Sequence, residues 1–227
     1  MPTRKERQVI RTRNTIIGVV AAIVVIVIGY GLVYSTGLTE GEFQAGTHYE
    51  VIEDARGRRP GEPIEVREFF SYACIHCRNF DPMIEDWQAG KPDGVEFQRT
   101  PVTFSPVWAL LARTYLALDE LGALERNHER LFSAIHDQGR QFLSAEMVAD
   151  YVDGYGVSRE DFLRAFDSTA VRSRFRQAER DQRELRIASV PTLVVDDKYR
   201  IGMEVGRRTA LDVLDHIIAL EQSAETP

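Results

Sequence analysis

The sequence predicts an α/β layer architecture with a helical insertion, preceded by one membrane-spanning helix. Three observations predict it: an uncharged apolar segment near the N-terminus, strand-like runs that alternate with helical segments, and a long helical block between two of these strands. The composition is that of a folded protein, since 44% of the 227 residues are hydrophobic and 28% are charged. The net charge of −7 argues against nucleic acid as the main partner.

A basic flank and an apolar run occupy the N-terminus. Residues 1–14 carry five bases and one acid, a net charge of +4, which leaves −11 for the rest of the chain. The run 16–33 is almost entirely Ile, Val, Ala, Gly and Leu. Eighteen helical residues at about 1.5 Å each span roughly 27 Å, close to the hydrocarbon thickness of a bilayer.

A cleaved secretory signal is the main alternative for this segment. Its apolar region usually covers about 7–15 residues and ends at a small-x-small site, and no clear A-x-A follows here. We therefore predict a cytoplasmic segment at 1–14, an uncleaved transmembrane anchor at 15–35 and a linker at 36–47. The basic flank keeps the N-terminus in the cytoplasm and places the acidic body outside it.

Two strands joined by a helix begin the folded part. Tyr49–Ile52 is a short strand, and Ile64–Tyr72 is rich in apolar and aromatic residues, as buried strands are. Cys74–Gln88 is predicted as a helix, with a kink at Pro82. Val95–Thr103 forms the second long strand after a Lys-Pro-Asp-Gly turn. A strand–helix–strand order favours a parallel pair.

The region 105–186 is predicted to be entirely helical. Ser105 followed by Pro106 is an N-cap with a first-turn proline, and Ser158 with Asp161 resembles a capping box. Apolar residues recur at helical spacing through the whole region. Its apolar stripes therefore indicate packing rather than a ligand site.

A hairpin and a closing helix complete the chain. Thr192–Val195 is a strand, residues 196–198 turn the chain, and Tyr199–Met203 pairs back. An amphipathic helix follows at about 209–220. The expected division is an α/β domain made of residues 48–104 and 187–223, with residues 105–186 inserted.

The chemistry concentrates where the first long strand meets its helix. Cys74 and Cys77 are the only cysteines and lie three residues apart, on one helix face at a separation that a disulfide needs. Cys74 falls at the helix N-terminus, where free N–H groups and the helix dipole stabilise a thiolate. Thiols in such motifs titrate at about pH 3.5–7.5, and His76 can add positive charge beside them. Cys77 lies one turn deeper, so it is better placed to resolve a mixed disulfide than to attack a substrate.

Other uses of this motif are weaker. A zinc site would need two of the five histidines, and covalent haem needs histidine after the second cysteine, where Arg78 stands. An inert disulfide across three residues closes too small a loop to stabilise the fold. We therefore favour redox chemistry and expect neither a metal nor a cofactor. His128 and His136 are expected on helix surfaces, without a role.

Two segments together resemble the DsbA family of thiol–disulfide oxidoreductases. One is the run Glu68–Tyr72 leading into Cys74-Ile75-His76-Cys77, and the other is Ser189-Val190-Pro191-Thr192 with the strand and turn that follow. The order of elements from about residue 46 to 222 agrees, and the first 40 residues have no counterpart. The resemblance implies a thioredoxin-like fold with an inserted helical domain.

The resemblance also implies residue roles. Cys74 would be the nucleophile and Cys77 the resolving thiol of a redox-active disulfide. Pro191 would be a cis-proline packed against that disulfide, with Val190 lending backbone groups to a substrate strand. The family's dipeptide between the cysteines is usually Pro-His, and Ile75 departs from it. Because this dipeptide tunes thiolate stability, the reduction potential is not implied.

Glu68 is a further candidate. Alternation places it on the inward face of its strand, so its pKa should be raised and it could exchange a proton with the deeper thiol. The family often carries an acid at this position. The alternative is a carboxylate neutralised by a base that the sequence does not locate.

The sequence thus predicts a thiol–disulfide oxidoreductase that donates disulfides to exported polypeptides and is reoxidised by a membrane quinone-linked partner. Its expected location is the bacterial inner membrane, with a single pass and a periplasmic catalytic domain. A disulfide reductase or isomerase on the same fold is one alternative. A membrane-tethered module that binds polypeptides or a metal without redox turnover is the other.

Overall fold

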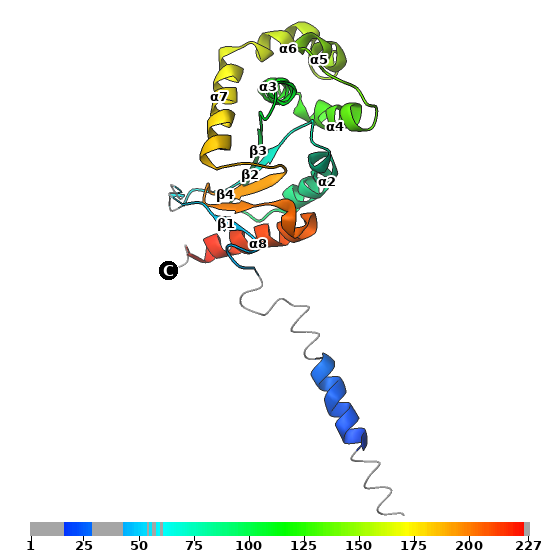
Figure 1. The fold of residues 1–227 in the computed structure, drawn as a ribbon, viewed down its shortest axis with the longest axis vertical. Helices are drawn as coiled ribbons and strands as arrows, with labels where there is room; N and C mark the ends of the chain where they lie inside the picture. The colour runs from blue at the N-terminus through cyan, green and yellow to red at the C-terminus, as the bar shows by residue number, and fades with distance from the viewer. Residues whose placement is uncertain (1–15, 29–42, 54, 56–57, 60, 225–227) are drawn as a thin grey trace, which may run out of the picture. The chain divides into compact units, whose positions relative to one another are not determined.

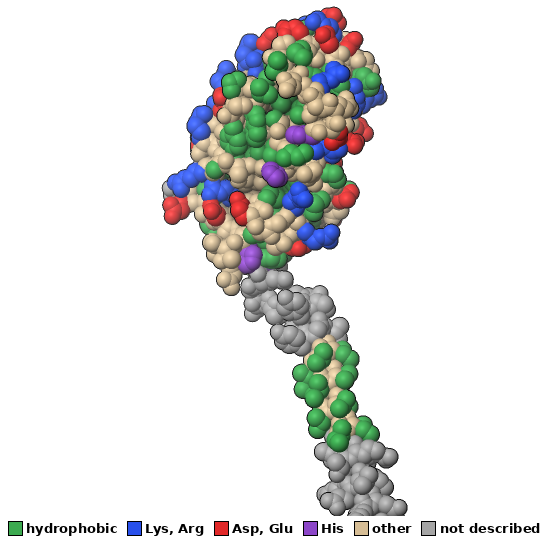
Figure 2. All heavy atoms as spheres, turned by 45° about the vertical axis from the view of Figure 1, so that its right-hand side comes forward, with side chains coloured by type: hydrophobic (Ala, Val, Ile, Leu, Met, Phe, Trp, Pro, Cys, Tyr) green, Lys and Arg blue, Asp and Glu red, His purple; other side chains and the backbone are tan. Residues whose placement is uncertain are grey.

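The computed structural model describes residues 16–28, 43–53, 55, 58–59 and 61–224. The chain divides into two units, Met1–Gln44 and Ala45–Pro227. In the first unit residues 16–28 form a helix, and its side chains are hydrophobic (Figure 2). Within the described ranges, no helix is both long enough and apolar enough to cross a membrane. Residues 1–14 of the predicted cytoplasmic segment, residues 15 and 29–35 of the predicted anchor and residues 36–42 of the predicted linker lie outside these ranges.

The second unit contains a five-stranded mixed sheet in the order β1-β5-β4-β2-β3 (Figure 1). β2 pairs with β3 in parallel and with β4 antiparallel, and β4 and β5 form the predicted hairpin. The sequence prediction of each strand is confirmed, although β2, β3 and β5 end two residues earlier than expected. The strands are β1 (Glu50–Val51), β2 (Ile64–Phe70), β3 (Val95–Pro101), β4 (Thr192–Val195) and β5 (Tyr199–Ile201).

Helices cover this sheet and extend beyond it. α2 (Ile75–Gly90) leads from β2 to β3, and Pro82 lies inside it without ending it. The closing helix α8 (Arg207–Ala224) packs against α2, β4 and β5, and is longer than predicted at both ends. Five helices lie between β3 and β4 in the chain, and Figure 1 shows where they lie relative to the sheet. They are α3 (Pro106–Glu120), α4 (Leu124–His136), α5 (Ala145–Val152), α6 (Arg159–Phe166) and α7 (Thr169–Glu184).

Polar side chains begin these helices where the sequence predicts. The Ser105 hydroxyl accepts a hydrogen bond from the Trp108 N–H, with Pro106 as the first helical residue. The Ser158 hydroxyl accepts from the Asp161 N–H at 3.1 Å, which confirms the N-cap, and it donates to the Asp161 carboxylate at 2.6 Å, so that carboxylate bonds the hydroxyl rather than the Ser158 N–H that a full capping box would use. Such caps satisfy amide groups that have no partner within the helix, and each typically stabilises it by about 1 kcal/mol.

Strand β2, in the interior of the sheet, contributes to two hydrophobic clusters. Phe70 belongs to a large cluster with Tyr72 and the helical block, whereas Phe69 packs with Val194 and the segment after α7. Alternation along a strand explains this split, because neighbouring side chains point to opposite faces. Trp108 and Val190 pack against both clusters. The carboxyl end of β2 is therefore held from both faces of the sheet, and it supports the segment that carries the two cysteines.

Candidate active site

The two cysteines lie at the start of α2. Cys74 is its N-cap residue and Cys77 lies in its first turn. The Cys74 N–H donates to the Ser71 carbonyl at 3.1 Å, so a tight turn links β2 to the helix. Both cysteines are free thiols, with 8% of Cys74 and 1% of Cys77 exposed. This difference makes Cys74 the sulfur that an incoming group reaches first.

The surroundings shift the pKa values of the two thiols in opposite directions. The pKa of Cys74 is lowered to about 6, chiefly by a hydrogen bond from the Cys77 side chain. The backbone N–H groups of Cys77 and His76 add to this lowering, and the charge of His76 adds less than either. Burial raises the pKa of Cys77 well above its usual range. At neutral pH the reduced pair therefore holds one thiolate, on Cys74, and one thiol, on Cys77.

A second segment, residues 189–192, lies far from Cys74 in the sequence but next to it in the structure. The Val190–Pro191 peptide bond is cis, as the resemblance implies. The Val190 carbonyl oxygen lies 3.4 Å from the Cys74 sulfur. The Thr192 hydroxyl donates to the Ser189 carbonyl at 2.8 Å and ties this loop to the start of β4. The backbone of this loop thus passes directly beside the Cys74 sulfur.

Glu68 lies beneath the cysteines and is almost fully buried, with 1% of it exposed. Its carboxylate accepts a hydrogen bond from Arg99 Nε at 2.8 Å, and the two residues are register partners on β2 and β3. Burial nevertheless raises the pKa of Glu68 to about 7, because desolvation outweighs the attraction of Arg99. The carboxyl is therefore buried with a raised pKa, and Arg99 is the base that the sequence did not locate.

Arg99 also contacts carboxylates other than that of Glu68. Its guanidinium also contacts Asp81 at 3.1 Å and Glu85 at 2.8 Å. Donor atoms of Asp81, Glu85 and His128 lie within 4.8 Å of one another, beside a cavity of about 430 Å³. These are residue types that bind divalent metals. The guanidinium already bonds both carboxylates, however, and supplies the cation of this cluster.

His128 was expected on a helix surface, and this expectation is wrong. It is buried, with Nε2 at 2.9 Å from the Asp81 carboxylate and Nδ1 at 2.8 Å from the Tyr72 hydroxyl. His136 is half-buried, and its Nε2 lies 2.8 Å from the Tyr72 carbonyl oxygen. Leu131 and Phe132 follow His128 at three and four residues, so its place on the apolar face of α4 could have been recognised.

Comparison of the chain with known proteins agrees with this geometry. The family model of the DSBA-like thioredoxin domain matches residues 65–218. The chain belongs to this family. It is 33% identical over 191 residues to the thiol:disulfide interchange protein DsbA of Azotobacter vinelandii, covering 83% of this chain and 89% of that protein. It is also 33% identical to DsbA of Pseudomonas aeruginosa, with 81% and 88% covered.

Solved structures of this family have the same fold. The crystal structure of Pseudomonas aeruginosa DsbA superposes with a TM-score of 0.78 at 30% identity, covering 82% of this chain and 98% of that one. The oxidoreductase DsbA from Xylella fastidiosa gives 0.75 at 32% identity, with 80% and 98% covered. The chain is therefore a thiol–disulfide oxidoreductase with a DsbA-type thioredoxin fold.

Proposed function

We propose that this enzyme is a disulfide-donating oxidase for exported polypeptides and that Cys74 and Cys77 form its redox-active disulfide. The observation that carries the proposal is the lowered pKa of Cys74, about 6. A thiolate exists only after the disulfide is reduced, so whatever stabilises it favours the reduced protein. A protein whose reduced form is stabilised is a stronger oxidant.

The reaction proceeds by two thiolate attacks. A substrate thiolate attacks the Cys74 sulfur, the Cys74–Cys77 bond breaks, and Cys77 takes up a proton because its pKa is raised. A second substrate thiolate then attacks the substrate sulfur of the mixed disulfide, and Cys74 leaves as a thiolate. Two electrons pass from the substrate to the enzyme. Of the two substrate thiol protons, one ends on Cys77 and the other is released to solvent above about pH 6.

Four further residues support this reaction. Glu68, with a pKa of about 7, can supply the proton that Cys77 takes up and accept it again during reoxidation. Val190 offers backbone groups to an extended substrate, and Pro191 holds that backbone against the disulfide. His76 is exposed and adds positive charge near the Cys74 thiolate.

We also propose that residues 15–35 anchor the enzyme in the bacterial inner membrane, with residues 1–14 cytoplasmic and the catalytic part periplasmic. The support is the uncharged apolar sequence and the helix at 16–28, whose large side chains are about half exposed or more. A membrane quinone-linked protein would then reoxidise Cys74 and Cys77. Mature protein that starts near Met1 and stays with membranes after a carbonate wash supports the anchor, whereas a start near residue 35–45 contradicts it.

The family part is proposed to comprise an α/β domain, residues 48–104 and 187–223, and a helical domain, residues 105–186. The five consecutive helices between β3 and β4 support this division. The helical domain would cover the active site and the cavity beside His128.

Trapping tests the roles of the two cysteines. Cys77→Ser should accumulate mixed disulfides with exported proteins, because nothing within the enzyme resolves them, while Cys74→Ser should trap none. Trapping by Cys74→Ser alone would reverse the assignment. Equilibration with glutathione tests the direction of electron flow. A potential well above the roughly −270 mV of the reductant thioredoxin supports an oxidase, and a value at or below it indicates a reductase.

A further inference from the structure

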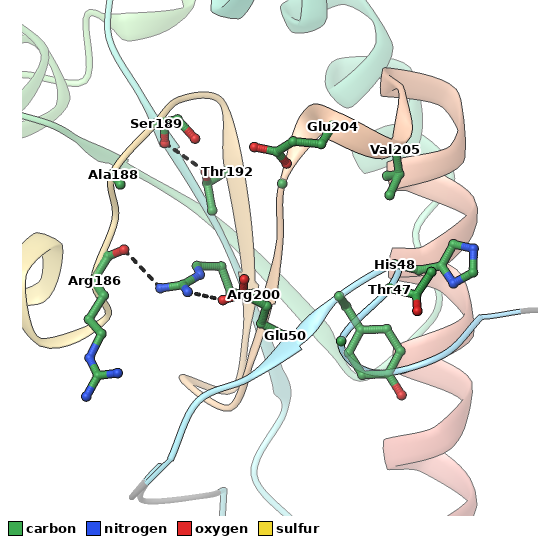
Figure 3. A pocket seen from close by; sticks show the side chains of 13 residues that line it. Thr47, His48, Glu50, Arg186, Ala188, Ser189, Thr192, Arg200, Glu204 and Val205 are labelled. Atoms are coloured by element: carbon green, nitrogen blue, oxygen red, sulfur yellow. Dashed lines mark hydrogen bonds and ion pairs between the residues drawn. The ribbon is translucent and has the colours of Figure 1, made fainter.

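A cavity of about 400 Å³ opens beside the loop that carries Val190 and Pro191 (Figure 3). Ser189 and Thr192 line it from this loop, and Gly202, Glu204 and Val205 line it from the segment after β5. Ser189 is the neighbour of Val190, whose carbonyl oxygen lies 3.4 Å from the Cys74 sulfur. An extended chain advances about 3.3 Å per residue. A polypeptide lying across Cys74 therefore reaches this cavity within about two to four residues.

The positive charge at the base of the cavity is already neutralised. Arg200 pairs with the Glu50 carboxylate and donates to the carbonyl oxygens of Leu185 at 2.7 Å and Arg186 at 2.9 Å. The Arg186 side chain extends away from Glu204 (Figure 3). Arg200 thus has little charge left to offer an anionic ligand.

Two charged lining residues, Arg186 and Glu204, have no ion-pair partner among the described residues, and of the two it is Glu204 that faces the cavity (Figure 3). Its side chain crosses the cavity toward Ser189 and Thr192 (Figure 3). Among the residues that the structure describes, none forms an ion pair or hydrogen bond with its carboxylate. The carboxylate of Glu204, without an ion-pair partner, is therefore the charged group that points toward whatever enters the cavity.

Gly202 makes room for this arrangement. A Cβ atom at Gly202 would lie 1.9 Å from Glu204 Oε2, so any other residue would displace the carboxylate. The backbone of Gly202 is ordinary extended backbone, with φ of −87°, and does not itself require glycine. The absence of a side chain at this position is what lets the carboxylate turn inward.

We propose that this cavity is a substrate subsite that binds a lysine or arginine side chain close to the reacting cysteine of the polypeptide being oxidised. Glu204 supplies the charge, Gly202 the space, and Ser189 and Thr192 the polar wall. The inference rests on the proposed oxidase function and on the role of Val190 beside the substrate. It makes Glu204 a specificity-determining residue.

Matched dithiol peptides test the subsite with the oxidised full-length enzyme. The peptides form two series that carry Lys, Gln or Glu at one position. This position lies two to four residues before the reacting cysteine in one series and two to four residues after it in the other. In one series kcat/KM should fall in the order Lys, Gln, Glu. One exposed ion pair corresponds to about a two- to fivefold difference, which should shrink at high salt.

Three variants and one control separate the loss of the subsite from a general loss of folding or activity. Glu204→Gln should make the three peptides equal, and Glu204→Lys should invert their order, which a misfolded protein cannot do. Gly202→Ala should weaken the preference by pushing the carboxylate out. Glu96→Gln removes an exposed glutamate from β3, at the opposite edge of the sheet, and should keep the wild-type order. Equal rates for all peptides in both series with wild-type enzyme would overturn the subsite while the oxidase function stands. Failure to oxidise any peptide would overturn both.

Discussion

Replacing Glu68 by glutamine should change how the stability of the protein depends on pH. Burial raises the pKa of Glu68 from 4.5 to about 7 in the folded protein. Between these values the folded state holds a proton on Glu68 that the unfolded state has lost. The free energy of unfolding therefore falls by about 1.4 kcal/mol per pH unit, or about 3 kcal/mol in total, as the pH rises from 4.5 to 7. Above pH 7 the loss is complete and constant.

Glutamine cannot ionise, so Glu68→Gln should lack this loss. Its free energy of unfolding relative to wild type should rise by about 3 kcal/mol from pH 4.5 to 7.5. Any constant cost of the substitution, such as the altered hydrogen bond to Arg99, shifts the whole curve without changing this slope. The titration of Cys74 also contributes in both proteins and cancels in the difference.

Urea unfolding of the full-length reduced proteins at several pH values measures the effect. Glu96→Gln is the control, since Glu96 is exposed on the neighbouring strand β3. A stability difference between Glu68→Gln and wild type that stays constant from pH 4.5 to 7.5 would refute the reasoning. It would mean that Arg99 compensates the ionised carboxylate as fully as water does.

Three further predictions concern the cysteines and the core. His76→Ala should lower the reduction potential by about 20 mV or less, because the charge of an exposed side chain contributes about 1 kcal/mol at most. Equilibration with glutathione measures the potential, and a larger drop would contradict the exposed position of His76. The stability of the reduced protein relative to the oxidised one should rise by about 1.4 kcal/mol per pH unit from pH 6 to 9, since the folded Cys74 thiol loses its proton at about 6 and the unfolded one at 9.0, while the contribution of Glu68 is common to both forms; thiolate absorbance should show a midpoint at about 6, and a midpoint near 9 would contradict it. Phe70→Ala should lower the free energy of unfolding, measured in urea, by about 3–5 kcal/mol, because the Phe70 ring is buried against the rings of Tyr72, Tyr115 and Phe132. A loss below about 1 kcal/mol would show that the core collapses around the cavity.

The strands and helices could be predicted because their signals are local. Alternation and apolar runs identified β2 and β3, and serine caps identified the starts of α3 and α6. The boundaries differ by a few residues where hydrogen bonding, rather than side-chain pattern, decides the end. Met203 was expected in the last strand, for example, but begins a short 3₁₀ helix.

The buried charges around Glu68 depend on pairing between distant segments and could not be predicted in the same way. The sequence places Glu68 facing inward, but Arg99 becomes its partner only through the register of two parallel strands. A shift of one residue would turn Arg99 to the other face. His128 reaches Asp81 only because α4 packs beside α2. Its burial could be read from the helical pattern, but its partners could not.

The shared guanidinium of Arg99 explains why the proton resides on Glu68. Glu68, Asp81 and Glu85 all contact this one cation, and a single positive charge cannot compensate three ionised carboxylates. Glu85 is half exposed at its side chain and Asp81 also contacts His128, whereas Glu68 is the most deeply buried. Protonation of Glu68 therefore relieves the cluster at the least cost. In the reaction that we propose, Cys77 leaves the disulfide as a thiolate, which adds another negative charge nearby and strengthens the demand for that proton. Transfer from Glu68 to Cys77 would then remove the charge from the sulfur, and the carboxyl could be protonated again because its pKa is about 7.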